Sequence, residues 1–472
     1  MSLGFPQNTS NKIFLINEAG KRLSYFEFYD AQFEFQKYID KRKVVLVLCD
    51  STMGSVMGLF SFLINGQIPL LLEKTLDIDL IKNIINRYQV EYIFITSIDM
   101  EKFPHYEKIA SLEDYVLLKT DTSCEEEPHK DLALLLSTSG TTGSPKMARL
   151  SYRNVLSNAD SIITYLDINS EDRAITTLPI SYSFGLSIMT SHMLAGASII
   201  LTKYSILERG FWDAFENHRP TSLSGVPFTF EMLKKIKFFY KQPSNNLRTL
   251  TQAGGKMRDE LIFEISEFSK KYNIDFYVMY GQTEATARIS FLDPESTQEK
   301  IGSIGKAIPG GVLSIGYIDK NVSKKFKSQG ELIYSGPNVM MGYAEHRSDL
   351  TKEDELNGVL ATGDVATVDE DGYYFIIGRL KRFIKISGKR LNLEEVENIL
   401  QTYNYDAACV GKDDRLFIYS SEEGVIVKLK RLVCEKFKLN PLTVEVEYIS
   451  EIPRTVNGKI DYKELEKRSS EY

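Results

Sequence analysis

Short apolar runs alternate along roughly the first 300 residues with longer stretches in which apolar positions recur every three to four residues. Continuous Val-, Ile- and Leu-rich runs are typical of buried strands, and the longer period is typical of amphipathic helices. The predicted strands are 44–50, 92–96, 132–137 and 197–202. The predicted helices are 53–67, 152–166 and 227–240. This alternation predicts an α/β fold whose sheets are covered by helices.

The texture of the chain changes after about residue 300, where Gly and Pro become frequent and the apolar runs shorten. Such a pattern predicts a β-rich subdomain made of hairpins. From Lys381 onward, a helix at 394–403, two short strands, a helix at 425–437 and a strand at 444–450 indicate a small α/β unit. The sequence therefore predicts a large N-terminal domain, 1–380, and a small C-terminal domain, 381–472.

Composition excludes several classes of protein. The 472 residues are 43% apolar and 26% charged, with a net charge of −7 and no basic block, which argues against nucleic-acid binding. Four scattered cysteines without a CxxC spacing predict neither a disulfide framework nor a zinc site, and they favour a reducing cytoplasm. The start of the chain lacks the features of a signal peptide, and polar residues and Pro69 interrupt the longest apolar stretch, so we expect no membrane span.

The segment STSGTTGSPK, 137–146, has the composition of a phosphate-binding loop. It follows the predicted strand and precedes a helix expected to begin near Ser151. Glycines let backbone N–H groups turn toward an anion, hydroxyls add donors, and Lys146 adds a charge. The spacing differs from a Walker A loop, because Gly140 and Gly143 are only two residues apart and Lys146 does not follow directly. The predicted phosphate ligands are Thr138, Ser139, Gly140, Thr141, Thr142, Gly143 and Lys146.

This loop resembles the signature motif of the adenylate-forming, or AMP-binding, superfamily of acyl-CoA synthetases, stand-alone adenylation enzymes and luciferases. The resemblance continues in order over roughly residues 130–465. It implies a large AMP-binding domain followed by a small mobile domain that carries a catalytic lysine. It also implies ATP and Mg²⁺ as cofactors, with CoA or a carrier-protein phosphopantetheine as the acceptor.

Two segments resemble the nucleotide site of this family. In the motif YGQTE, the resemblance implies that Tyr280 and Gly281 line the adenine, that Thr283 bonds a phosphate oxygen, and that Glu284 holds Mg²⁺. The turn AGGK resembles the Gly-rich turn beside the adenine and contributes Gly254 and Gly255, although Lys256 stands where many relatives have Pro.

Further motifs lie in the last quarter of the chain. Asp364 of TGD is suited to a ribose diol, and Arg379 is expected near the ribose or phosphate. Lys381 occupies the position of the family's hinge, and Gly388 the loop that approaches a pantetheine arm. Lys459 in PRTVNGKI resembles the lysine that catalyses adenylation.

The segment LPISYSFGL, 178–186, resembles the border of the family's acyl pocket, with Tyr182 in place of the more usual His. Tyr182, Phe184 and Gly185, with Val226 from another turn, are the predicted pocket residues, although the aromatic side chains equally suit a buried core. The segment offers no acid to hold an ammonium group, which argues against an α-amino acid substrate.

The resulting hypothesis is an AMP-forming acid–thiol ligase of carboxylic acid metabolism, fatty acids included, that forms acyl-AMP and transfers the acyl group to CoA. Loading of a carrier protein and transfer to an amine or oxygen acceptor remain alternatives. A nonenzymatic nucleotide-binding protein is a further alternative. Joint retention of five expected polar residues argues against a decayed site. These residues are Lys146, Glu284, Asp364, Arg379 and Lys459.

Overall fold

The computed structural model describes residues 11–39, 42–138, 146–316, 329–386, 389–412, 414–455 and 458–469. The chain forms two compact units. The first comprises Met1–Val312 and Ser335–Leu360, and the second comprises Leu313–Tyr334 and Ala361–Tyr472. The α/β class is as predicted. The contacts group the hairpin strands after residue 360 with the C-terminal elements, and the functional boundary between 380 and 381 stays a prediction.

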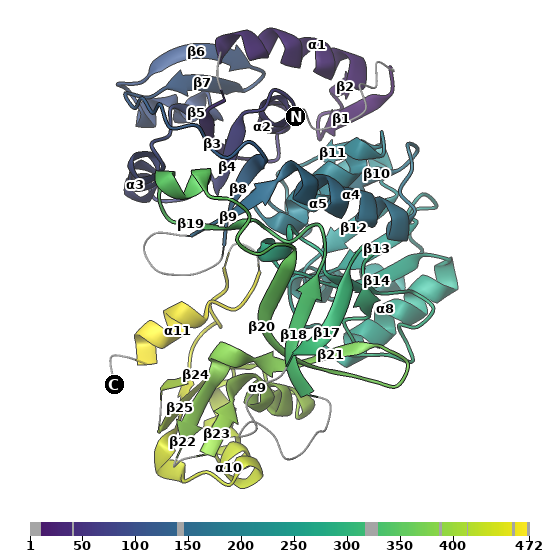
Figure 1. The fold of residues 1–472 in the computed structure, drawn as a ribbon. Helices are drawn as coiled ribbons and strands as arrows, with labels where there is room; N and C mark the ends of the chain where they lie inside the picture. The colour runs from purple at the N-terminus through teal and green to yellow at the C-terminus, as the bar shows by residue number, and fades with distance from the viewer. Residues whose placement is uncertain are drawn as a thin grey trace. The chain divides into compact units, whose positions relative to one another are not determined.

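One sheet of the first unit has eight strands in the order β19-β9-β8-β4-β3-β5-β7-β6 (Figure 1). Its centre is parallel, and β3 is buried at all six positions because helices cover both faces. The strands are β3 (Val44–Cys49), β4 (Ile68–Glu73), β5 (Tyr92–Thr96), β6 (Glu107–Leu112), β7 (Tyr115–Lys119), β8 (Leu132–Ser137), β9 (Met147–Ser151) and β19 (Gly342–Ala344). Helices α1 (Tyr25–Phe35), α2 (Met53–Ile64) and α3 (Ile78–Tyr88) belong to the same region.

The second sheet of this unit has nine strands in the order β16-β15-β14-β13-β12-β10-β11-β1-β2. The strands are β1 (Ile13–Asn17), β2 (Arg22–Ser24), β10 (Arg173–Ile175), β11 (Ser198–Leu201), β12 (Ser222–Gly225), β13 (Thr249–Gln252), β14 (Asp275–Tyr280), β15 (Ser290–Leu292) and β16 (Lys306–Ala307). The helices are α4 (Tyr152–Leu166), α5 (Ser183–Leu194), α6 (Arg209–His218), α7 (Pro227–Lys235) and α8 (Asp259–Tyr272).

Helix α5 joins the cores of the two sheets. Leu186, Met189 and Met193 pack in the cluster that includes strands of the eight-stranded sheet. Phe184 and Ile188 pack in a second cluster with residues of β14. A helix buried at every position from Ser183 to Met193 exposes no face to solvent, and it lies between the two sheets.

The helix expected near Ser151 is confirmed, because α4 has Ser151 as its N-cap. Strand β9, which lies between the phosphate loop and this helix and pairs antiparallel with β8, was not predicted. One predicted boundary is wrong. The helix predicted at 227–240 ends at Lys235, and a short 3₁₀ turn, Phe238–Tyr240, follows it. By contrast, the helix predicted at 152–166 coincides with α4, whose capping box at Ser151 and Asn154 fixes its start.

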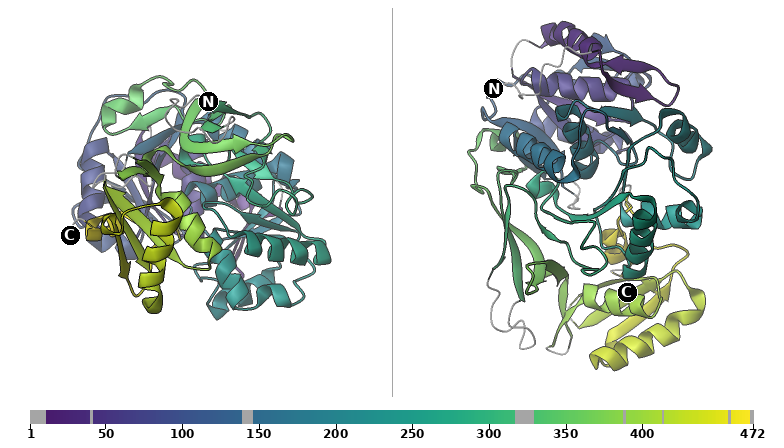
Figure 2. Two further views of the ribbon diagram at one scale, coloured as in Figure 1. Left: turned by 90° about the horizontal axis from the view of Figure 1, so that it is seen from below. Right: turned by 90° about the vertical axis from the view of Figure 1, so that its right-hand side faces the viewer.

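The second unit contains the predicted hairpins and the predicted small α/β elements, coloured green to yellow in Figure 2. Strands β17 (Val312–Gly316), β18 (Gln329–Ser335), β20 (Val359–Val368) and β21 (Tyr374–Arg379) form one sheet. Strands β22 (Phe383–Ile386) and β23 (Lys389–Asn392) form a hairpin, and β24 (Ala407–Lys412), β25 (Arg415–Ser420) and β26 (Val444–Tyr448) form a third sheet. The helices are α9 (Leu393–Thr402), α10 (Ile426–Phe437) and α11 (Tyr462–Ser469). Among the described residues, no helix combines the length and the apolar character needed to traverse a bilayer.

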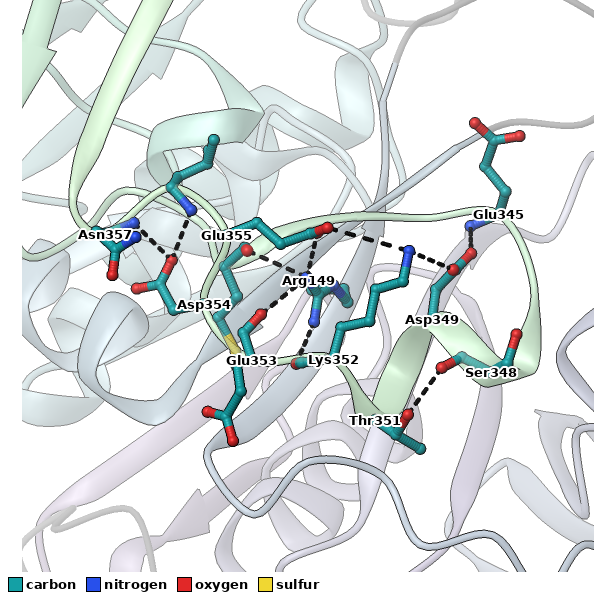
Figure 3. A network of polar contacts seen from close by, with 12 residues as sticks. Arg149, Glu345, Ser348, Asp349, Thr351, Lys352, Glu353, Asp354, Glu355 and Asn357 are labelled. Carbon is teal, nitrogen blue, oxygen red and sulfur yellow. Dashed lines mark hydrogen bonds and ion pairs between the residues drawn. The ribbon is translucent and has the colours of Figure 1, made fainter.

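A buried guanidinium ties β9 to the segment that follows β19 (Figure 3). The Arg149 side chain is fully buried and donates to the carbonyl oxygens of Lys352, Met341 and Glu353 at 2.6, 3.1 and 3.2 Å. It also donates to a carboxylate oxygen of Glu355 at 2.6 Å. A side chain at Gly342 would collide with this pair, since its Cβ would lie 2.8 Å from an Arg149 nitrogen. Arg149 therefore fixes the path of residues 341–355.

We expect Arg149→Met to lower the free energy of unfolding by about 2–3 kcal/mol, because several carbonyl oxygens lose their donor together with a charged partner. Urea denaturation measures the loss. The matched control is Arg153→Met, which removes an exposed arginine from the first turn of α4. Equal free energies of unfolding for the two variants would show that the Arg149 hydrogen bonds contribute nothing to stability.

Candidate functional site

The predicted phosphate loop is pinched at its base by the β8–β9 hairpin. Thr138 donates to the carbonyl oxygen of Lys146 through both its backbone N and its Oγ1, each at 3.1 Å. The Lys146 ammonium lies 2.5 Å from a carboxylate oxygen of Glu345. The other predicted loop ligands, Ser139, Gly140, Thr141, Thr142 and Gly143, lie outside the described residues. The described part of the loop is therefore the base of the β8–β9 hairpin, with Lys146 directly before strand β9.

The YGQTE motif forms the turn at the end of β14. A side chain at Gly281 would overlap the carbonyl oxygen of Ala287, so only glycine fits there. The Gln282 amide donates to the Tyr280 hydroxyl at 3.1 Å, and Thr283 donates to Ser183 Oγ at 3.3 Å. The last bond connects this turn to the start of α5.

Glu284 and Lys146 converge on a tyrosine that the sequence analysis missed. The Tyr343 hydroxyl donates to a carboxylate oxygen of Glu284 at 2.7 Å, and the Lys146 ammonium lies 6.0 Å from the Tyr343 ring centre. Burial, followed by the negative charge of Glu284, raises the pKa of Tyr343, so the phenol stays a donor at neutral pH. The pairing of Tyr343 with Ala148 between β19 and β9 produces this arrangement.

This arrangement suits a magnesium ion that takes most of its ligands from phosphates and water, rather than a metal ion held by protein side chains alone. Within the described part of the chain, no group of three or more His, Cys, Asp or Glu side chains could hold a metal ion. Mg²⁺ commonly uses one or two carboxylates and takes its other ligands from phosphates and water. The single carboxylate of Glu284, close to a lysine at a hairpin exit, fits that pattern.

A strained turn follows Glu284. Thr286 adopts φ +62° and ψ −54°, and Ala287 N donates to Ala285 O at 2.6 Å, which defines a γ-turn of the rare positive-φ kind. Asn338 holds this turn from two sides. Its side-chain amide donates to Ala285 O at 2.9 Å, and its backbone carbonyl oxygen accepts a hydrogen bond from the Thr286 hydroxyl at 2.7 Å. Strain of this sort persists only where the surroundings enforce it.

The predicted acyl-pocket residues meet the predicted adenine turn. Gly254 has φ +88°, and a Cβ there would lie 2.7 Å from Tyr182 Oη and 3.1 Å from Val226 Cγ1. Val226 and Phe184 are buried in the cluster that joins α5 to residues of β14, whereas Tyr182 is only partly buried at the edge of that cluster. Tyr182 therefore lines the site. Phe184 is buried behind it. This position is compatible with both interpretations of the Phe184 ring, as part of the core and as a wall of the acyl pocket. Gly185 packs against the Pro179 carbonyl, and Gly255 faces Pro227.

Asp364 and Arg379 form an ion pair in the second unit. Arg379 Nε lies 2.9 Å from Asp364 Oδ1, and the two residues are register partners across β20 and β21. Asp364 is 2% exposed, whereas the Arg379 side chain is 58% exposed. The backbone N of Gly363 donates to Glu331 at 3.0 Å, at a φ of +74°. The predicted ribose carboxylate is therefore rigidly placed.

The predicted hinge residue lies in a short 3₁₀ turn, Leu380–Arg382. Its neighbour Arg382 makes two 2.8 Å bonds to Glu397 of α9 and stacks 3.9 Å from the ring centre of Tyr462. The Tyr462 hydroxyl donates to Glu397 at 3.1 Å. The structure describes the backbone of Lys381 but not its side chain, and Gly388 lies outside the described residues.

Lys459 ends a tight turn near the C-terminus. Thr455 N donates to Lys459 O at 2.7 Å, Gly458 N donates to Thr455 O at 2.8 Å, and Arg454 bridges to Ile460. Gly458 has φ +73°, a conformation that favours glycine. The turn therefore fixes the backbone from which the Lys459 side chain projects.

A family model described as AMP-binding enzyme matches residues 5–344. The chain is 26% identical over 469 residues to a 2-succinylbenzoate–CoA ligase of Listeria innocua, with coverage of 96% of this chain and 95% of that protein. It is 30% identical over 390 residues to a feruloyl-CoA synthase of an Amycolatopsis species, with coverage of 77% of each.

Solved structures share the fold. The O-succinylbenzoate coenzyme A synthetase of Bacillus subtilis in complex with AMP superposes with a TM-score of 0.77 at 22% identity, over 98% of this chain and 96% of that one. Its complex with ATP and a magnesium ion gives 0.74 at 21% identity, over 98% of each chain.

A pH-dependent stability follows from His192 of α5. Its Nδ1 lies 2.9 Å from Ile188 O, and burial lowers the pKa of the imidazole to about 4. Unfolding restores a pKa of about 6.5, so the unfolded chain binds the extra proton between about pH 6.5 and 4 and stability falls as the pH drops. We expect wild type to lose roughly 2 kcal/mol more than His192→Gln between about pH 7.5 and 5, by urea denaturation. Equal losses would show that His192 is protonated in the folded protein.

Proposed function

The chain belongs to the family of AMP-binding enzymes, and on that premise we propose that it is an ATP-dependent acid–thiol ligase. It activates a carboxylic acid as acyl-AMP, releases pyrophosphate and transfers the acyl group to CoA. The observation that carries the proposal is that Lys146 and Glu284 both contact Tyr343, beside the predicted phosphate loop.

The predicted family, the α/β fold class and the enzyme class are confirmed by the family match and by relatives named CoA ligases. ATP and magnesium agree with the bound state of a structural neighbour. CoA is the acceptor in the names of both curated relatives. Carrier-protein loading stays a proposal, as does a cytoplasmic location.

Adenylation joins two anions, a carboxylate and the α-phosphate of ATP, so the site must neutralise charge and align the reactants. The carboxylate is already ionised at neutral pH and needs no general base. Magnesium, when bound by Glu284, supplies Lewis-acid neutralisation of the phosphates. Tyr343 holds Glu284 in place through its hydroxyl, and Lys146 adds a positive charge beside it.

The second unit supplies the remaining groups. We assign the ribose to Asp364 and Arg379, whose ion pair fixes both. Lys459 is assigned to the reacting carboxylate and the α-phosphate, where a positive charge stabilises the transition state. Rotation about Lys381 then replaces Lys459 with the loop around Gly388 for the thioester step.

Carboxylate-dependent ATP–pyrophosphate exchange without a thiol tests the proposal. We expect exchange with some members of a panel of short, medium, aromatic, hydroxy and dicarboxylic acids, and none with α-amino acids. CoA and a holo carrier protein, added separately with the best acid, then identify the acceptor by thioester formation. ATP binding without exchange for any acid would favour either an acid outside the panel or a nonenzymatic nucleotide-binding protein.

Lys459→Ala separates the two half-reactions. We expect acyl-AMP formation to fall about 10²–10³-fold, because one preorganised donor to the transition state is lost. Thioester formation from synthetic acyl-AMP should stay within a few-fold of wild type. The control is Lys467→Ala, which removes an exposed lysine of α11. A parallel loss of both half-reactions would contradict the assignment.

A further inference from the structure

A second buried arginine lies four residues after Glu284. Arg288 is 3% exposed and stands between the γ-turn at Thr286 and strand β15. Its carbonyl oxygen accepts hydrogen bonds from the side-chain amides of Asn338 at 2.8 Å and Asn158 at 3.3 Å. The same turn that presents Glu284 therefore fixes the backbone of Arg288.

Among the described residues, the guanidinium has aromatic neighbours but no carboxylate partner. Its central carbon lies 4.0 Å from the ring centre of Phe184, and the Tyr165 hydroxyl is a hydrogen-bonding neighbour. Burial raises the pKa of Tyr165, so that phenol carries no charge at neutral pH. Arg288 Nε is buried without a hydrogen-bond partner, and no ion pair joins Arg288 to any acid in the described part of the chain. Fully buried arginines are ordinarily paired, because an uncompensated charge in the interior is costly.

Arg288 lines a small cavity of mixed character beside the nine-stranded sheet, with isoleucine and leucine side chains among the polar ones. The cavity has a volume of about 20 Å³, room for about one water molecule. Its wall includes Ser187, Ser191, His192, Ser224, Thr251 and Arg288. A space of this size holds one water molecule beside the guanidinium and leaves no room for an alkyl chain beyond it.

The one acid in the cavity wall is already satisfied. Asp172 accepts two bonds from Arg248, at 3.1 and 2.6 Å, and one from Thr221 at 2.9 Å. It therefore balances Arg248 and leaves the charge of Arg288 uncompensated. The ring of Phe184, on which Arg288 stacks, lies 6.4 Å from the ring of Tyr182, centre to centre, and the Tyr182 hydroxyl borders Gly254 at the predicted adenine turn. The uncompensated charge thus lies beside the predicted acyl-pocket residues.

We propose that the substrate is a short dicarboxylic acid, in which one carboxylate is adenylated and the other pairs with Arg288. The inference rests on the proposed ligase function and adds the class of the acid to it. A guanidinium binds a carboxylate through a planar pair of N–H donors, and Phe184 beneath it keeps the plane in one orientation. The cavity beyond Arg288 retains water rather than substrate.

The test compares acids that differ only in the second carboxylate: malonate with propionate, succinate with butyrate, and glutarate with valerate. Each is assayed by ATP–pyrophosphate exchange and, independently of turnover, by calorimetric binding to the protein. We expect wild type to prefer the best dicarboxylate over its partner by about 10²-fold or more, since a site built for a polar group rejects an analogue that lacks it.

Two substitutions separate the second carboxylate from the reacting one. Arg288→Met should weaken binding of the dicarboxylate by about 10²-fold and leave the monocarboxylate within a few-fold of wild type. Arg288→Lys should restore part of the preference, because it keeps the charge and loses the planar fork. The control Arg209→Met removes an arginine whose side chain is 93% exposed. Thermal unfolding of each variant checks that it folds.

The outcomes are distinguishable. Arg288-dependent binding of dicarboxylates without exchange would support this pocket and refute the ligase function. Monocarboxylates used as well as dicarboxylates, an equal loss with both classes in Arg288→Met, or no dicarboxylate bound at all would overturn the proposal.

Discussion

The buried guanidinium of Arg149 is the constraint on which the geometry of the first unit's site depends. Its hydrogen bonds fix residues 341–355 against β9, and that segment carries both Tyr343 and Glu345. Those two side chains contact Glu284 and Lys146. A charge placed inside a sheet edge is costly unless several acceptors surround it. Here the acceptors come from a segment about 200 residues away, so satisfying the arginine also assembles the site.

The strained turn at Thr286 divides two tasks between neighbouring residues. Glu284 precedes the turn and faces Tyr343, whereas Arg288 follows it and stacks on Phe184. A regular helix or strand would not reverse the chain within so few residues. Asn338 enforces the reversal by bonding on both sides of it. Stored backbone strain of this kind is characteristic of functional sites, and it places the proposed magnesium ligand and the proposed partner of the acid within one short segment.

The sequence predicted the elements whose apolar pattern was continuous. Strand β3 ends one residue before its predicted end and helix α4 coincides with its prediction, because the first is apolar throughout and apolar positions recur at helical spacing in the second. Strand β9 was missed because Arg149 interrupts its apolar run, and an arginine is ordinarily taken as exposed.

The candidate site divides along similar lines. Motif resemblance identified Glu284, Lys146, Asp364 and Arg379 as site candidates, and the structure describes the contacts of each. Tyr343 and Arg288 have no local signal, since their roles arise from strand pairing and burial across distant parts of the chain.

The bonds of Arg382 to Glu397 and its stacking on Tyr462 have a consequence for the modularity of the chain. They join the residue directly after the predicted hinge to helix α9 and to the helix that follows Lys459. A rotation at the proposed hinge, residue 381, would therefore move Lys459 together with helix α9. An exchange of C-terminal segments between relatives therefore has a natural junction before Arg382. A junction after Glu397 would combine the arginine of one parent with the tyrosine of another and would require the two to fit.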